Sequence, residues 1–163
     1  MKTLLILRHA KSSWDDPKLA DQDRPLNKRG KREAPRIGQL LREEDLLPDL
    51  ILSSTARRAR KTAEAVAEAS GYSGEIEFSG AFYPGDPSDY IDTLQDAPDG
   101  CECIMVVGHN PGLEELLEAL TGESAHLTTA ALAQVSLPIL HWYELDGETE
   151  GKLLNLWRAK QLG

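Results

Sequence analysis

The sequence predicts one α/β domain, with a mostly parallel central sheet and helices on both of its faces. Its 163 residues correspond to about one domain. Short apolar runs alternate with longer stretches whose apolar residues recur at helical spacing, a pattern typical of repeated strand and helix units. Several of the short runs are apolar without interruption, as in strands that are buried on both faces. We therefore treat residues 1–163 as a single domain.

The N-terminal part of the chain alternates two predicted strands with two predicted helices. Residues 3–7 form a continuous apolar run bounded by charge, which indicates a buried strand. Residues 28–44 follow as an amphipathic helix, with Asn27 as a suitable N-cap. Its apolar residues at helical spacing are Ala34, Ile37, Leu40 and Leu41. The second strand is expected at 49–53 and the second helix at 55–70.

The C-terminal part begins with another strand and helix and ends in a group of shorter strands. Residues 103–108 form the third continuous apolar run, and residues 113–120 have the pattern of a helix with an acidic, solvated face. The shorter strands are expected at 133–137, 141–145 and 152–156. The pair Asp146-Gly147 is a turn signal between the last two.

Charge is distributed unevenly along the chain. The chain has 18 Lys and Arg residues and 27 Asp and Glu residues, which gives a net charge of -9. This acidic balance argues against nucleic acid as the main partner, because phosphate backbones bind clustered cations. Residues 1–61, however, hold 15 basic and 9 acidic residues, a net of +6, whereas residues 62–163 hold 3 and 18, a net of -15. An asymmetry of this size needs a functional explanation.

The sequence predicts a cytoplasmic protein that does not enter a membrane. The apolar start of the chain stops at Arg8, short of the roughly 7 to 15 apolar residues of a signal peptide. No run approaches the roughly 20 apolar residues of a membrane span. Cys101 and Cys103 are too few for a disulfide scaffold and lie too close in sequence to bridge each other in a strand.

Histidine and arginine residues follow the predicted strands where the strands end. Arg8-His9 ends the first strand, Arg58 lies in the helix after the second, and His109 follows the third. Ligands of open parallel sheets bind beyond the carboxyl ends of the strands, so these residues can converge on one crevice. Guanidinium groups match the geometry of phosphate, and a neutral histidine can attack phosphorus as a nucleophile. Spacing alone leaves a structural role for the two histidines equally open.

Three ordered motifs resemble those of the histidine phosphatase, or phosphoglycerate mutase-like, superfamily. Leu7-Arg8-His9-Ala10-Lys11 resembles its Arg-His-Gly signature, although Ala10 replaces the glycine. The segment 53–64, SSTARRARKTAE, is similar to its Ser-Ser-Pro-x-x-Arg-Ala-x-Gln-Thr-Ala motif, and 106–110, VVGHN, to its second-histidine motif. With the chain length and the segment 23–30, DRPLNKRG, they point to the small SixA-type phosphohistidine phosphatases.

The resemblance implies a phosphoglycerate mutase-like fold and a set of site residues. It makes His9 the nucleophile that becomes phosphorylated, with Arg8 and Arg58 binding the phosphoryl group and His109 completing the pocket. Arg58 is preferred to Arg57 because it directly precedes the alanine of the motif. Arg24 is expected to reach the phosphate as well, with a structural ion pair to Asp21 or Asp23 as an equal alternative. No metal and no cofactor are implied.

The chain departs from the larger family members in its general acid. Asp86 and Asp89 fall in the corresponding region, but neither aligns cleanly, and we expect a role in the surface loop or as a helix N-cap. An alkoxide leaving group needs an acid, whereas an imidazole leaves readily. The sequence therefore favours phosphohistidine on a partner protein as substrate over a small phosphorylated molecule.

Three other functions stay open. One is a broad-specificity small-molecule phosphomonoesterase of the same superfamily, and another is a phosphate-binding module without catalysis. A metallohydrolase using His9 and His109 would need further ligands, and His126 and His141 fall in a predicted loop and edge strand. The basic N-terminal part holds all the proposed phosphate-handling residues except His109, so its charge is explained at least in part by an anion site.

Overall fold

The computed structural model describes residues 1–163 and contains a six-stranded mixed sheet in the order β3-β2-β4-β1-β5-β6. The strands are β1 (Lys2–Arg8), β2 (Leu50–Ser54), β3 (Ile76–Ser79), β4 (Cys103–Gly108), β5 (Ala131–Leu137) and β6 (Lys152–Arg158). The pairings among β3, β2, β4 and β1 are parallel, and β5 pairs antiparallel with both β1 and β6. The predicted fold class is confirmed.

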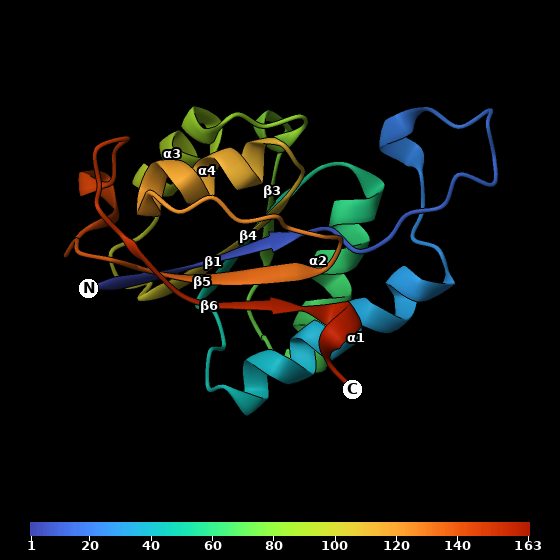
Figure 1. The fold of residues 1–163 in the computed structure, drawn as a ribbon, viewed down its shortest axis with the longest axis horizontal. Helices are drawn as coiled ribbons and strands as arrows, with labels where there is room; N and C mark the ends of the chain where they lie inside the picture. Colours follow the sequence, from blue (N-terminus) through green and yellow to red (C-terminus); the bar gives the residue numbers. More distant parts are fainter.

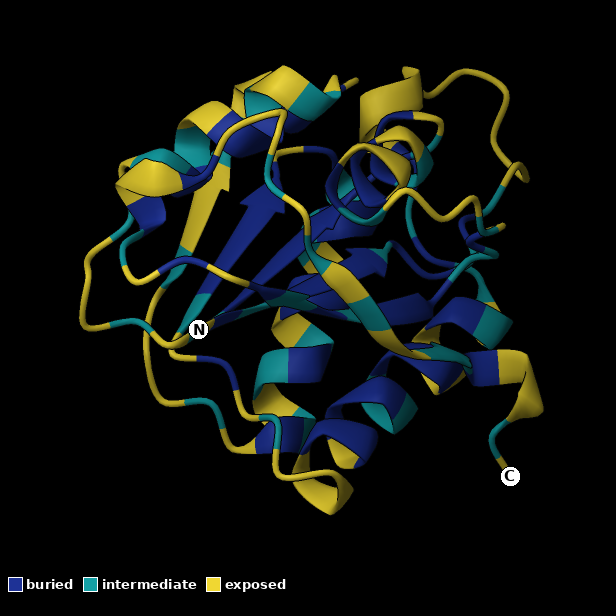
Figure 2. Cartoon of the chain, turned by 60° about the vertical axis from the view of Figure 1, so that its left-hand side comes forward, coloured by how far each residue is buried: buried dark blue, intermediate teal, exposed yellow.

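Helices cover both faces of the sheet, as Figure 1 shows. The helices are α1 (Lys28–Glu43), α2 (Arg57–Ser70), α3 (Pro87–Gln95) and α4 (Gly112–Thr121). Side chains alternate along a strand, so Leu5 and Leu7 of β1 join the core beneath α1 and α2, whereas Leu4 and Ile6 join the core beneath α3 and α4. The residues of both cores are buried, and the central strands are accordingly dark blue in Figure 2. None of the helices is both long and apolar enough to cross a lipid bilayer.

The start of α1 packs directly on the turn that follows β1. Asn27 is its N-cap, as predicted, and the Asn27 side chain accepts a hydrogen bond from the Gly30 N–H at 2.9 Å. The Asn27 N–H donates to the Lys11 carbonyl at 3.0 Å, and a Cβ at Gly30 would overlap that carbonyl oxygen. Glycine at position 30 therefore lets the helix approach the backbone just after His9.

The predicted strand at 141–145 is wrong. The chain there forms a loop with a short 3-10 turn, Trp142–Glu144. Trp142 is fully buried against the core beneath α3 and α4, and its Nε1–H donates to the Cys101 carbonyl at 2.7 Å. Trp142 therefore fills the core from a loop and not from a strand, while Tyr143 is exposed.

The sequence pattern also missed β3, and it gave no range for α3 although a helix N-cap was expected at Asp86 or Asp89. The strand β3 lies at an edge of the sheet and is only partly covered, so it lacks the uninterrupted apolar run of a central strand. The helix α3 is short and buries Tyr90, Ile91 and Leu94. Three apolar residues over nine positions are a weak periodic signal.

Candidate active site

The carboxyl ends of β1, β2 and β4 meet at one edge of the sheet and bring the predicted site residues together. Arg8 lies level with Gly108 in the parallel pairing of β1 and β4, so His9 and His109 emerge side by side. Their ring centroids are 5.1 Å apart. The cavity beyond them has a volume of about 210 Å³. All five predicted site residues line it: Arg8, His9, Arg24, Arg58 and His109.

His9 lies at the buried end of this site in a defined tautomer. Its side chain is 7% exposed, and its Nδ1 lies 2.8 Å from the Ala10 carbonyl oxygen. A carbonyl only accepts, so Nδ1 carries the proton and Nε2 keeps its lone pair. Burial, together with the charges of Arg58 and Arg8, lowers the pKa of His9 to about 3 despite the bond to Ala10. The ring is therefore neutral at ordinary pH, with Nε2 available as a nucleophile.

Thr62 of α2 holds the backbone beside His9. Its hydroxyl accepts a hydrogen bond from the Ala10 N–H at 2.9 Å and donates to the Arg58 carbonyl at 2.7 Å. The same Ala10 residue that orients the His9 ring is thus tied to the helix that carries Arg58. The sequence motif contains Thr62, but nothing local in it predicted this bridge.

His109 presents an unpartnered nitrogen. Its Nε2 lies 2.8 Å from Ser54 Oγ, and that oxygen already accepts a bond from the Ala56 N–H at 3.1 Å. If Ser54 donates its proton to Nε2, then Nδ1 is the protonated nitrogen. Nδ1 is buried and has no partner. Burial, with Arg58, lowers the pKa of His109 to about 4. In that tautomer, the neutral ring can donate one hydrogen bond from Nδ1 to a ligand.

The three arginines are held at defined places around the histidines. Arg8 Nη1 donates to the Leu127 carbonyl at 3.0 Å, and its buried Nε has no partner. Arg58 is 7% exposed and donates from Nη1 and Nη2 to the backbone carbonyl and carboxylate of Asp21, at 2.8 and 3.0 Å. Arg57, the alternative weighed in the sequence, is half-buried and does not line the cavity.

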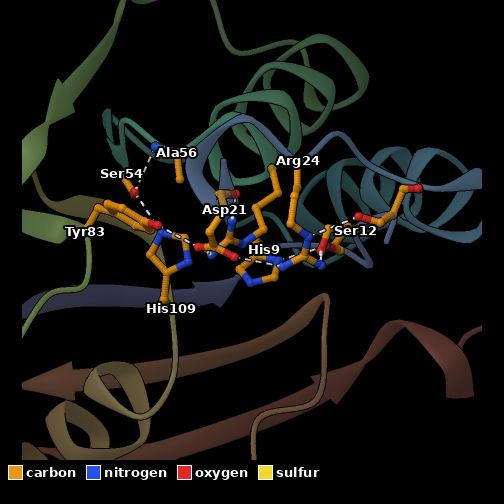
Figure 3. A network of polar contacts seen from close by, with 11 residues as sticks. His9, Ser12, Asp21, Arg24, Ser54, Ala56, Tyr83 and His109 are labelled. Atoms are coloured by element: carbon orange, nitrogen blue, oxygen red, sulfur yellow. Dashed lines mark hydrogen bonds and ion pairs between the residues drawn. The ribbon is translucent and has the colours of Figure 1, made fainter. Parts of the chain in front are cut away.

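Arg24 both lines the cavity and forms the ion pair that was its alternative role. Its Nη1 lies 3.0 Å from Asp21 Oδ1, and its Nη2 donates to Ser12 Oγ at 2.5 Å. Its guanidinium stacks on the exposed ring of Trp14, 3.2 Å from the ring centroid. Asp23 pairs with neither Arg24 nor Arg58. Figure 3 shows Asp21 among the labelled site residues, beside Arg24, His9 and His109.

Tyr83 is the residue that sequence reasoning missed, and Asp21 was expected only as an ion-pair partner of Arg24. The Tyr83 hydroxyl donates to Asp21 Oδ2 at 2.5 Å. That bond, followed by those from Arg24 and Arg58, lowers the pKa of Asp21 well below its usual range. The Tyr83 ring also lies edge-on to His109, with centroids 5.4 Å apart. Tyr83 is 62 positions from Asp21, so only the fold brings the two together.

The acidic residues considered as general acids lie elsewhere. Asp86 is the N-cap of α3, and its backbone N–H donates to Asp89 Oδ2 at 2.7 Å. Neither side chain lines the cavity, in agreement with the expected capping role. His126 and His141 pair with Glu114 and Asp99, and no three His, Cys, Asp or Glu side chains come together as a set of metal ligands.

The lowered histidine pKa values predict how stability depends on pH. The unfolded chain takes protons on these rings near pH ~6.5, whereas folded His9 takes one only near pH 3. Between these two pH values the unfolded state binds more protons than the folded state. The contribution of the neutral His9 ring to the free energy of unfolding is therefore complete above about pH 6.5 and declines as the pH falls toward about 3. Urea unfolding at about pH 7.5 and 5 tests this. The His9→Asn variant should lose less stability than the wild type over this interval.

Comparisons with known proteins give one family model and several similar sequences. The family model of the histidine phosphatase superfamily (branch 1) matches residues 4–79. An uncharacterized chloroplastic protein of Arabidopsis thaliana is 39% identical over 82% of this chain, and the chain spans 66% of that relative's length. An uncharacterized protein of Mycobacterium tuberculosis is 36% identical over 78% of this chain and 77% of its own length.

Solved structures show the same fold over nearly the whole chain. The putative phosphohistidine phosphatase SixA from Agrobacterium tumefaciens is 31% identical, with a TM-score of 0.81 over 96% of this chain and 97% of its own. The protein histidine phosphatase SixA complexed with tungstate has a TM-score of 0.84 at 24% identity, over 99% of both chains.

Proposed function

This chain belongs to the histidine phosphatase superfamily, and we propose that it is a phosphohistidine phosphatase, which hydrolyses phosphohistidine on a protein through a covalent intermediate on His9. One observation carries the proposal. The neutral His9 ring, with its lone pair on Nε2, shares a cavity with Arg8, Arg58 and the unpartnered Nδ1 of His109. A nucleophile and donors for the phosphoryl oxygens therefore face the same space.

In the first step, His9 Nε2 attacks phosphorus and the bond from phosphorus to the substrate nitrogen breaks. The electron pair of that bond stays on the substrate ring. His9 becomes a phosphoimidazolium, whose positive charge is stabilised because Nδ1–H donates to the Ala10 carbonyl. Arg8 Nε and His109 Nδ1, both buried and unpartnered, donate to the phosphoryl oxygens, on which charge accumulates in the transition state.

In the second step, water attacks the phosphorus of phosphorylated His9. The bond from phosphorus to Nε2 breaks, its electron pair returns to Nε2, and the proton of the water goes to the phosphate or to solvent. His9 is restored as the neutral Nδ1–H tautomer. Because the Ala10 carbonyl holds the same proton throughout, His9 can both accept and release the phosphoryl group without a separate acid.

The choice of phosphohistidine rests on the leaving group. No carboxyl group lines the cavity, so the site lacks the general acid that an alkoxide would require. An imidazole with a proton on its other nitrogen departs as a neutral ring. The SixA protein from Agrobacterium tumefaciens is named a putative phosphohistidine phosphatase, and the other SixA, named a protein histidine phosphatase, binds tungstate, an anion with the shape of phosphate. The missing acid and the relatives' names support phosphohistidine as substrate, and the bound tungstate supports a site for a phosphoryl group.

The decisive experiment compares two substrates with one enzyme preparation. We expect kcat/KM for a histidine-phosphorylated phosphotransfer domain to exceed that for glycerol 3-phosphate by about 10² or more, the usual contribution of a general acid. Activity should persist in EDTA and be inhibited by vanadate. Faster turnover of the ester would identify a small-molecule phosphomonoesterase instead. Binding of phosphate without any turnover would identify a non-catalytic module.

A further inference from the structure

Asp21 is the acidic residue that both cavity-lining arginines, Arg24 and Arg58, hold in ion pairs. It does not line the cavity itself. Its negative charge nevertheless acts on the ring of His109, and in Figure 3 its carboxylate lies between the labelled rings of His9 and His109. Asp21 is therefore next to the phosphoryl cavity, outside the set of residues that surrounds the phosphoryl group.

The Asp21 carboxylate has unused acceptor capacity. Oδ1 accepts one hydrogen bond, from Arg24, and Oδ2 accepts two, from Arg58 and Tyr83. A carboxylate offers about four lone-pair sites, so Oδ1 retains room for another donor. The side chain is 48% exposed, which leaves it accessible to a ligand. The same hydrogen bonds keep the carboxylate ionised at neutral pH.

Like the His9 ring, the substrate ring must carry a proton on the nitrogen that is not bonded to phosphorus. A phosphoimidazole departs as a neutral imidazole only when its second nitrogen carries a proton. The protein meets this requirement for His9 with the Ala10 carbonyl. The incoming ring lies on the opposite side of phosphorus from His9 Nε2, in line with attack, and so projects out of the cavity in which the phosphoryl group sits.

We propose that Asp21 accepts a hydrogen bond from the free N–H of the substrate phosphoimidazole and thereby makes the site selective for phosphohistidine. The inference rests on the proposed function. When His9 attacks, the bond from phosphorus to the substrate nitrogen breaks and its electron pair stays on that nitrogen. The proton remains on the other nitrogen, bonded to Asp21, so the ring leaves neutral and no proton is transferred.

Other carboxylates near the site are poorly placed for this role. Glu114 Oε2 already accepts bonds from Asn110, His126 and the Leu127 N–H, and Glu114 lines a separate surface hollow. Asp23 is two residues from Asp21, and its side chain pairs with neither site arginine. Asp21 alone combines a free lone pair with bonds to Arg24 and Arg58.

The charged and titratable groups that face Asp21 come from several elements. Arg24 follows the 3-10 turn Asp21–Asp23, Arg58 belongs to α2, Tyr83 precedes α3 and His109 follows β4. Arg24 and Arg58 stay charged at any working pH. His109 is neutral above about pH 4. A pH effect confined to phosphoimidazole turnover near neutrality therefore reports on the substrate ring.

The test measures kcat/KM for 1-phosphoimidazole and for p-nitrophenyl phosphate, whose leaving group needs no acid and carries no N–H. We expect Asp21→Asn to lower the phosphoimidazole to ester ratio by about tenfold or more, because the ring's N–H loses a charged acceptor. With phosphoimidazole, the decline in rate at high pH should also move about one unit lower. Asp23→Asn is the matched control, and its ratio should equal that of the wild type.

Each other outcome overturns the inference in a distinguishable way. If Asp21→Asn lost kcat/KM equally with both substrates, and circular dichroism showed an unchanged fold, Asp21 would only orient Arg24 and Arg58. An equal gain in kcat/KM with both substrates would show that Asp21 competes with the phosphoryl group for Arg24 and Arg58. A wild type that hydrolyses the ester but not phosphoimidazole would refute the proposed function together with this role, whereas the variant comparison refutes the role of Asp21 alone.

Discussion

Replacing His9 with alanine removes the nucleophile, and kcat with a histidine-phosphorylated protein is expected to fall by about 10⁴ or more, as when other enzymes lose theirs. The wild type should form a phosphoenzyme whose phosphate is lost in acid and retained in base, the behaviour of a phosphoramidate, and the variant should form none. Rapid quenching with a ³²P-labelled substrate measures both quantities. Substrate binding should be retained because the site arginines remain in place, so the loss should affect the chemical step.

His141→Ala is the matched control for that variant. His141 lies outside the cavity, where it pairs with Asp99 at 2.7 Å and stacks on Tyr143. Its removal should leave kcat and phosphoenzyme formation unchanged. His9→Gly adds a second readout, because free imidazole can enter the vacated space and restore part of the turnover. Wild-type activity in His9→Ala would contradict the covalent mechanism outright.

Arg58→Ala is expected to lower kcat/KM by about 10² to 10³, the range observed when one preorganised transition-state donor is lost. Arg58 is 7% exposed and its guanidinium lies in the cavity with both histidines. A planar, permanently charged group at this place stabilises the charge on the phosphoryl oxygens. Arg58→Lys should recover only part of the loss, because an ammonium group cannot reproduce the forked geometry that Asp21 holds.

The neighbouring arginine provides the control within the same helical turn. Arg57 directs its Nη1 to the Asp23 carbonyl, 3.4 Å away, and does not line the cavity. Arg57→Ala should therefore stay within about twofold of the wild type, as expected for an exposed polar contact. Steady-state kinetics with one phosphohistidine substrate compares the two variants. Equal losses of kcat/KM in Arg57→Ala and Arg58→Ala would show that the overall positive charge determines activity, and not the position of Arg58.

The features that sequence predicted share a local origin. The central strands were recognisable because each is buried on both faces and so is apolar without interruption, as in 3–7 and 103–108. The helix α1 was recognisable from its spacing and from Asn27 at its start. By contrast, β3 at the sheet edge and the short α3 carry little periodic signal. The loop around Trp142 resembled a strand because it contains adjacent aromatic residues, of which Trp142 fills the core and Tyr143 is exposed.

The site residues also divide into those that a local sequence pattern predicted and those that only the fold brought together. The sequence by itself determined the fold class and the placement of Arg8, His9 and His109 at strand ends, because strand order along the chain and burial pattern are local properties. Only the tertiary structure decided that Asp21 and Tyr83 belong to the same site. Asp21 follows β1 and Tyr83 follows β3, so their contact depends on the sheet order β3-β2-β4-β1. Hydrogen bonds between side chains so distant in sequence leave no periodic pattern from which they could be predicted.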